Sequence, residues 1–209
     1  MDVLPGGYPL CTKKRFAIKV LYHFLFGQLY LVSCIYLQNK LTKVDIKPSN
    51  IILHQHSVRF IDFGTSLDFS DRLEGSRSSG DPGPFSPRYS APEVHGLQQR
   101  STYSDIFSLG CVYIEILAQL EPKLVSLRPD ILQQPYHKDT EKLQNILQEA
   151  KESLKDPSLA PVLTCCIQMI DRTKETRIKA VNIVHELASA DKAVFFCKDC
   201  IVDLDKLNK

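Results

Sequence analysis

The sequence predicts a mainly helical fold that contains one short β-hairpin. Two apolar runs rich in β-branched residues, at 51–53 and 58–61, are separated by four polar residues, the pattern of two strands joined by a turn. A long apolar stretch covers residues 15–40, and the stretch at 106–117 is apolar on nearly every face, as in an interior helix. Further helical patterns follow residue 139.

Composition indicates an ordinary globular domain. The chain has 209 residues, 44% apolar and 24% charged, enough for one sizeable core or two small ones. Its formal net charge of +2 gives no reason to expect nucleic acid or a membrane surface as a partner. The seven cysteines are scattered, with no secretory signal in front, and adjacent Cys165 and Cys166 fall in an apolar helix. This pattern predicts buried free thiols and a reducing compartment, cytoplasmic or nuclear.

The apolar stretch at 16–37 has about the length of a transmembrane helix. Lys19, His23 and Gln28 interrupt it, and no second span follows. A charged residue inside a span costs a few kcal/mol. We therefore expect a long core helix over residues 15–40 and no membrane partner.

Polar residues lie at both ends of the predicted hairpin. Asp45, Lys47 and Asn50 precede its first strand, and Asp62 follows its second. Because a hairpin fixes the distance between its ends, Asn50 and Asp62 are expected side by side. An amide and a carboxylate are hard oxygen ligands of the kind that Mg²⁺ takes. Asp45 is then placed to orient a hydroxyl, and Lys47 adds positive charge where phosphate oxygens gather. Each residue also has a structural interpretation, as a turn former, a solvated side chain or a cap.

Five motifs occur in a characteristic order: DIKPSN at 45–50, DFG at 62–64, APE at 91–93, DIFSLG at 105–110 and Arg177 within DRTKETRIKA. This set resembles the eukaryotic protein kinases of the Ser/Thr type, over residues 1–190, and corresponds to their C-terminal lobe from the hinge onward. In that family the first motif is the catalytic loop and the second binds magnesium. The resemblance implies ATP and Mg²⁺ as cofactors and a protein substrate.

The resemblance also implies a role for each site residue. Asp45 accepts the substrate proton, Lys47 stabilises the transferred phosphoryl group, and Ser86 bonds both. Asn50 and Asp62 hold the metal, and the lysine of DIKPSN indicates Ser/Thr rather than Tyr specificity. Residues 87–90, PRYS, form a surface that faces the peptide substrate, which we call the peptide platform.

Residues 1–14 resemble the family's hinge. Met1 then stands at the gatekeeper position, Leu4 presents its backbone to adenine, and Tyr8 lies near the ribose. By its composition alone, the stretch is equally a flexible start with a Pro-Gly-Gly turn. If the hinge begins the chain, the N-terminal lobe is absent, with its glycine-rich loop, its VAIK lysine and its helix glutamate. We then expect weak or no nucleotide binding, and inactivity of the chain as given.

The remaining regions follow from the same comparison. Residues 43–64 form the catalytic loop and DFG hairpin, 65–93 the activation segment, 101–190 a helical subdomain and 191–209 a tail. Lys43 and Val44 replace the usual His-Arg, which puts phosphorylation control in doubt. The segment 65–88 is rich in Ser, Gly, Asp and Pro and is expected to be a mobile loop.

Three structural expectations complete the prediction. Glu93 and Arg177 should form a buried ion pair. Asp105 should accept backbone N–H groups of the loop around Val44. Helices are expected from a cap at Asp139 or Thr140, over 159–170 and over 178–189.

Cys197 and Cys200 form a single C-x-x-C, a weak zinc or redox signal, and an ordinary tail is favoured.

Three hypotheses for function stay open at this point. The first is a protein serine/threonine kinase that transfers phosphate from ATP to protein hydroxyls. The second is a pseudokinase or truncated C-terminal lobe that acts as a protein-binding module. The third is an incomplete gene model. The substrate, the pathway and the oligomeric state do not follow from the sequence.

Overall fold

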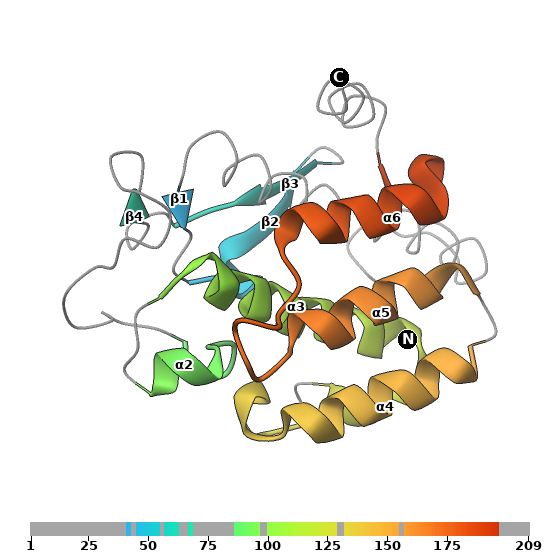
Figure 1. Cartoon of the computed structure of the whole chain (residues 1–209), viewed down its shortest axis with the longest axis horizontal. Helices are drawn as coiled ribbons and strands as arrows, with labels where there is room; N and C mark the ends of the chain where they lie inside the picture. The colour runs from blue at the N-terminus through green and yellow to red at the C-terminus, as the bar shows by residue number, and fades with distance from the viewer. Residues whose placement is uncertain are drawn as a thin grey trace.

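The computed structural model describes residues 41–42, 45–54, 57–62, 67–68, 86–96, 100–128, 132–154 and 157–196. Within these ranges the fold is mainly helical with a short hairpin, as the sequence predicts. In the view of Figure 1, the hairpin lies above α3 and α5, and α4 lies below them. The expected hinge (1–14) and long core helix (15–40) lie outside the described residues.

In the described part of the chain, four strands form two antiparallel pairs. β2 (Ile51–His54) pairs with β3 (Ser57–Phe60), and Ile51 lies opposite Phe60 in this register. His54 pairs with Ser57, so the strands are joined by two residues, whereas the sequence indicates a turn of four. β1 (Leu41–Thr42) pairs with β4 (Leu67–Asp68), which joins the segment before Asp45 to the segment after Asp62.

Five α-helices and four short 3-10 helices make up the rest of the described chain. The α-helices are α2 (Pro92–His95), α3 (Thr102–Leu120), α4 (Thr140–Glu152), α5 (Ala160–Met169) and α6 (Ala180–Phe195). The 3-10 helices are η1 (Pro48–Asn50), η2 (Pro122–Leu127), η3 (Tyr136–Lys138) and η4 (Pro157–Leu159).

Helix α3 is the interior helix that the sequence predicts, and it extends beyond 106–117 at both ends. Its apolar side chains are almost completely buried, including Phe107 at 0% exposure. Gly110 allows the close approach of α5, because a Cβ at this position would lie 2.9 Å from Met169 Cβ and 3.0 Å from Ile170 Cγ2. The packing of α3 against α5 therefore depends on the absence of a side chain at residue 110.

Helix α4 lies below α3 and α5 in the view of Figure 1 and packs against α5, which in turn packs against α3. Leu143, Leu147 and Ala150 fall on one face of α4 at helical spacing, and all three are buried. Asp139 occupies the N-cap position, but its side chain makes no capping bond and instead accepts a hydrogen bond from Gln134 Nε2. The start of α4 is thus predicted correctly, and the use of its cap side chain is not.

Helix α6 continues past residue 190, although the sequence was expected to continue from residue 191 as a tail. Asp191 has extended backbone angles (φ −163°, ψ 96°), which kinks the helix. Beyond the kink, Phe195 and Phe196 are buried at 1% and 2% exposure. The buried part of the domain therefore reaches at least residue 196. Cys197 and Cys200 lie outside the described residues.

The described cysteines are the expected buried free thiols: Cys111, Cys165 and Cys166. Burial raises the pKa of the Cys165 thiol to about 12, which keeps it protonated. Among the described helices, none is long and apolar enough to cross a bilayer. The apolar stretch 16–37 falls outside that search.

Candidate active site

The hairpin brings Asn50 and Asp62 to the same end. The Ile61 N–H donates to the Asn50 carbonyl over 2.9 Å, so Asp62 is the next residue beyond this bond. Asp62 is exposed and has a φ of 59°, in the left-handed region. Asp and Asn enter this region more readily than most residues, and backbone outliers of this kind cluster at functional sites. Asn50 and Asp62 are neighbours across the hairpin, as the sequence predicts.

Asp45 lies at the centre of a polar cluster formed by residues 45–50 and Ser86. Lys47 Nζ lies 2.5 Å from Asp45 Oδ2 and donates to Ser86 Oγ over 3.1 Å. Asn50 Nδ2 donates to the Asp45 carbonyl (2.9 Å) and to Asp45 Oδ2 (3.3 Å). Three of the four residues in this cluster come from the six residues DIKPSN. The fourth, Ser86, lies at least 36 positions away in the chain.

Local backbone geometry positions these side chains. Pro48 starts the short helix η1, and the Asn50 N–H donates to the Lys47 carbonyl over 3.0 Å. This turn folds the loop back so that Asn50, 5% exposed, points toward Asp45. Proline suits the first position of such a turn because it needs no N–H donor there.

The electrostatics of the cluster favour an ionised Asp45. Burial by itself would raise the pKa of Asp45, but hydrogen bonds from Lys47 and Ser86, together with the Lys47 charge, outweigh burial and lower the pKa below 3.8. Asp45 is therefore a charged hydrogen-bond acceptor at neutral pH. Such a group orients a hydroxyl strongly and accepts its proton as charge develops on the oxygen.

The residues at the hairpin end fit a magnesium ion. Asn50 uses its NH₂ group on Asp45, which turns the amide oxygen to the opposite side. With the Asp62 carboxylate, this oxygen makes a pair of hard donors. No cluster of three or more His, Cys, Asp or Glu side chains occurs in the part of the chain that the structure describes. Two protein donors suffice for Mg²⁺, which retains water and takes substrate phosphates as its other ligands.

The peptide platform is fixed on both sides. Ser90 Oγ and the Tyr89 N–H both donate to the Ser86 carbonyl, over 2.8 and 3.1 Å. Glu115 Oε1 accepts from Arg88 Nε (3.3 Å) and from the Tyr89 and Tyr136 hydroxyls (3.0 Å each). Together these bonds join the platform to α3 and η3.

Glu115 was missed by the sequence prediction. It is 9% exposed and lies within the run 106–117 of α3, where the other buried residues are apolar. A single acid within this apolar run is the signal that could have identified it, because buried acids need partners. Its partners, at residues 88, 89 and 136, are distant in sequence.

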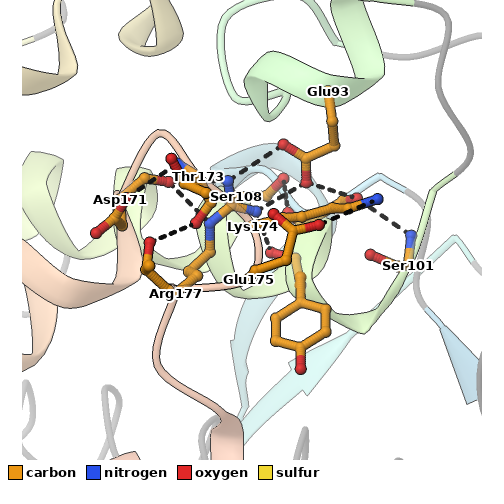
Figure 2. Close-up of polar contacts among 11 residues, drawn as sticks. Glu93, Ser101, Ser108, Asp171, Thr173, Lys174, Glu175 and Arg177 are labelled. Carbon is orange, nitrogen blue, oxygen red and sulfur yellow. Dashed lines mark hydrogen bonds and ion pairs between the residues drawn. The ribbon is translucent and has the colours of Figure 1, made fainter.

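The expected ion pair between Glu93 and Arg177 is confirmed. Arg177 Nη1 lies 2.8 Å from Glu93 Oε1, and Nη2 lies 3.2 Å from Oε2, with the two side chains 0% and 6% exposed (Figure 2). Arg177 also donates to the carbonyls of Tyr103 (2.7 Å) and Asp171 (3.0 Å from Nε). Ser104 Oγ donates to Glu93 over 3.3 Å. This network fixes α2 to the helical core.

Some predicted residues cannot be placed. Met1, Leu4 and Tyr8 of the expected hinge lie outside the described residues, as do Lys43 and Val44. Asp105 is buried at 3% exposure, but the loop around Val44 that it was expected to contact is not described. The site roles of Asp45, Lys47, Asn50, Asp62 and Ser86 stay predictions that their positions support.

Comparison with known proteins identifies the family. The model of the protein kinase domain family matches residues 11–187. Dual specificity protein kinase zak2 of Dictyostelium discoideum is 42% identical over 79 residues, 35% of this chain and 12% of that protein. The Serine/threonine-protein kinase STE7 homolog of Candida albicans is 31% identical over 110 residues (52% and 18%). A probable serine/threonine-protein kinase of D. discoideum is 27% identical over 140 residues (66% and 24%).

In these three comparisons the matched region spans between about an eighth and a quarter of each relative. The family match, in contrast, covers most of this chain and includes every described site residue. The chain belongs to the protein kinase family.

Proposed function

We propose that the chain carries the metal-binding and substrate-facing side of a protein serine/threonine kinase active site. The observation that supports this most is the Asp45 carboxylate, which Lys47, Asn50 and Ser86 contact together. A binding module has no need for an ionised acid held by three partners beside a surface loop.

In this proposal Asp45 orients the hydroxyl of the protein substrate and accepts its proton. Lys47 adds positive charge beside the transferred phosphoryl group, and Ser86 holds Lys47 and Asp45 in place. Asn50 and Asp62 hold Mg²⁺, which, when bound with ATP, neutralises the charge on the phosphates. Specificity for Ser and Thr is supported by Lys47 and by the names of two of the three relatives, which are serine/threonine-protein kinases.

In the family, the glycine-rich loop and the paired lysine that cover the phosphates come from the N-terminal lobe. Phosphoryl transfer depends on positioning and charge stabilisation, so in this proposal Asp45, Lys47, Asn50 and Asp62 act together with such groups.

Metal and nucleotide binding tests the proposal directly. Mn²⁺, a paramagnetic substitute for Mg²⁺, should broaden the amide signals of Asn50 and Asp62 when it is added with ATP. Asp62→Asn should remove this broadening, because it deletes one carboxylate while asparagine still adopts the left-handed φ of 59°. Glu141→Gln, which changes an exposed acid in the first turn of α4, is the control and should behave like the unmodified chain.

Two results would count against the proposal. Broadening that is equal in Asp62→Asn and in the unmodified chain would place the metal elsewhere and favour the binding-module hypothesis. Magnesium-dependent phosphoryl transfer that is unchanged in Asp45→Asn would contradict the proposed role of this carboxylate.

A further inference from the structure

Two histidines stack beside the peptide platform. The rings of His95, in α2, and His137, in η3, have centroids 3.7 Å apart and an interplanar angle of 28°. The two residues are 42 positions apart in sequence, and neither belongs to the motifs that identify the family. The pair therefore joins two elements that otherwise meet through the platform.

His95 contacts the platform itself. Its Nε2 lies 3.1 Å from the Pro87 carbonyl, in hydrogen-bond contact. The helix α2 that carries His95 is fixed two residues earlier, where Glu93 binds Arg177. Because α2 is held in this way, the orientation of the His95 ring decides whether the bond to Pro87 forms. The ring in turn is held by its stacking on His137.

The surroundings of His137 favour its neutral form. Its Nδ1 is buried and has no hydrogen-bond partner in the structure, so a proton added there would be left unpaired. Burial lowers the pKa of His137 to about 4, and the charges of His95 (α2), Lys138 (η3) and Arg172 (the turn before α6) act in the same direction.

The acid next to His137 in sequence does not counter these basic groups. The carboxylate of Asp139 is engaged by the side chain of Gln134. The groups that act on His137 from the elements packed against it are therefore all basic. A proton on His137 would be stabilised only if the stack opened to solvent.

We propose that His95 is a positioning residue of the peptide platform, which it holds at the Pro87 carbonyl as long as the His95–His137 stack is intact. The closed stack leaves the buried Nδ1 of His137 no partner for a proton, so acidification should open the stack and release Pro87. The identity of the ligand, a peptide that presents Ser or Thr, rests on the proposed function. The acid sensitivity of the platform does not.

The expected effect follows from proton linkage. If release of the platform returns His137 from a pKa of about 4 to its ordinary 6.5, release becomes more favourable as the pH falls below 6.5. Relative to pH 7.5, the equilibrium constant for release of the platform increases about fourfold at pH 6 and up to about thirtyfold at pH 5. Above pH 7 both states leave His137 neutral, so the platform should be insensitive to pH there.

Hydrogen exchange of the isolated chain measures the pH dependence of platform release without nucleotide or peptide. The Tyr89 N–H donates to the Ser86 carbonyl and the Tyr136 N–H to the Arg88 carbonyl, both over 3.1 Å, so these two amides report on the platform. After correction for the intrinsic exchange rate, their protection should fall about fourfold between pH 7.5 and 6. His137→Phe should abolish this fall, because phenylalanine keeps a stacking ring that does not titrate.

Two further variants complete the test. His185→Gln removes an exposed histidine of α6 and should retain the pH dependence of the unmodified chain. His95→Gln keeps a side-chain donor for Pro87 but removes the ring that stacks on His137, so protonation of His137 no longer affects Pro87 and protection should be independent of pH. If circular dichroism shows that His137→Phe does not fold, His95→Gln alone tests whether the stack causes the pH dependence of the platform.

Protection that is flat with pH in the unmodified chain would overturn the inference. An equal fall in the unmodified chain and in His95→Gln would also overturn it. Neither result depends on whether Mn²⁺ and ATP bind at Asn50 and Asp62, so failure here is distinguishable from failure of the proposed function.

Discussion

Replacement of Arg177 by methionine should destabilise the domain strongly. The Arg177 side chain is 0% exposed, and its guanidinium lies 5.1 Å from the centre of the Phe107 ring. Methionine keeps an apolar chain against this ring but leaves the Glu93 carboxylate, 6% exposed, without its cation. The carbonyls of Tyr103 and Asp171 also lose their donors.

Removal of one partner from a buried ion pair costs about 3–5 kcal/mol. For a domain of this size, such a loss lowers Tm by roughly 6–20 °C, given about 2–4 °C per kcal/mol. Urea unfolding followed by circular dichroism measures the free energy of unfolding, and a thermal scan provides Tm. We expect Arg177→Met to unfold at a clearly lower urea concentration and at a clearly lower Tm than the unmodified chain.

The double variant Glu93→Leu/Arg177→Met separates the unpaired charge from the loss of packing. Replacement of a whole buried pair by apolar residues is often close to neutral, so the double variant should be more stable than Arg177→Met alone. As a surface control, Lys174→Met disrupts the pair with Glu175 at 3.7 Å, whose side chains are 39% and 67% exposed, and should change stability by less than about 1 kcal/mol.

If Arg177→Met unfolds at the same urea concentration as the unmodified chain, the buried pair of Glu93 and Arg177 does not stabilise the domain as expected. The same conclusion follows if the double variant is as unstable as the sum of the two single variants, because the two side chains would then act independently.

Three further predictions concern other parts of the structure. Lys47→Met should raise the pKa of Asp45 above that in the unmodified chain, because burial is then opposed chiefly by Ser86; a carbon-13 titration of the carboxyl that shows no rise would contradict it. Gly110→Ala should destabilise the domain by about 1–3 kcal/mol in urea, since its Cβ would lie 2.9 Å from a core atom, whereas Gly96→Ala, with its nearest atom at 3.5 Å, should be nearly neutral. Glu115→Gln should speed tryptic cleavage after the arginine of the peptide platform, because it weakens the ion pair that holds this side chain, and unchanged cleavage by mass spectrometry would argue against such a clamp.

Much of the fold and the site follows from local sequence patterns. The alternation and turn around residues 51–61 predict the hairpin, and a hairpin places Asn50 beside Asp62 by geometry alone. The apolar run at 106–117 predicts an interior helix because burial on all faces requires apolar residues all round.

Features that depend on distant partners could not be predicted from these patterns. The stack of His95 on His137 and the bonds of Glu115 to three side chains form only when the helices have packed. The burial of Phe195 and Phe196 depends on the kink at Asp191, and nothing in the periodicity of α6 marks that position. Local spacing specifies elements, whereas packing decides which polar groups meet.

The central claim is that the end of the hairpin is a magnesium–nucleotide site, and the position of the bound metal tests it most directly. Crystals of the chain soaked with Mn²⁺ and ATP should show an anomalous scattering peak between the Asn50 amide oxygen and the Asp62 carboxylate. That peak should disappear in Asp62→Asn. A peak bound by other side chains, with none at these two residues, would contradict the account.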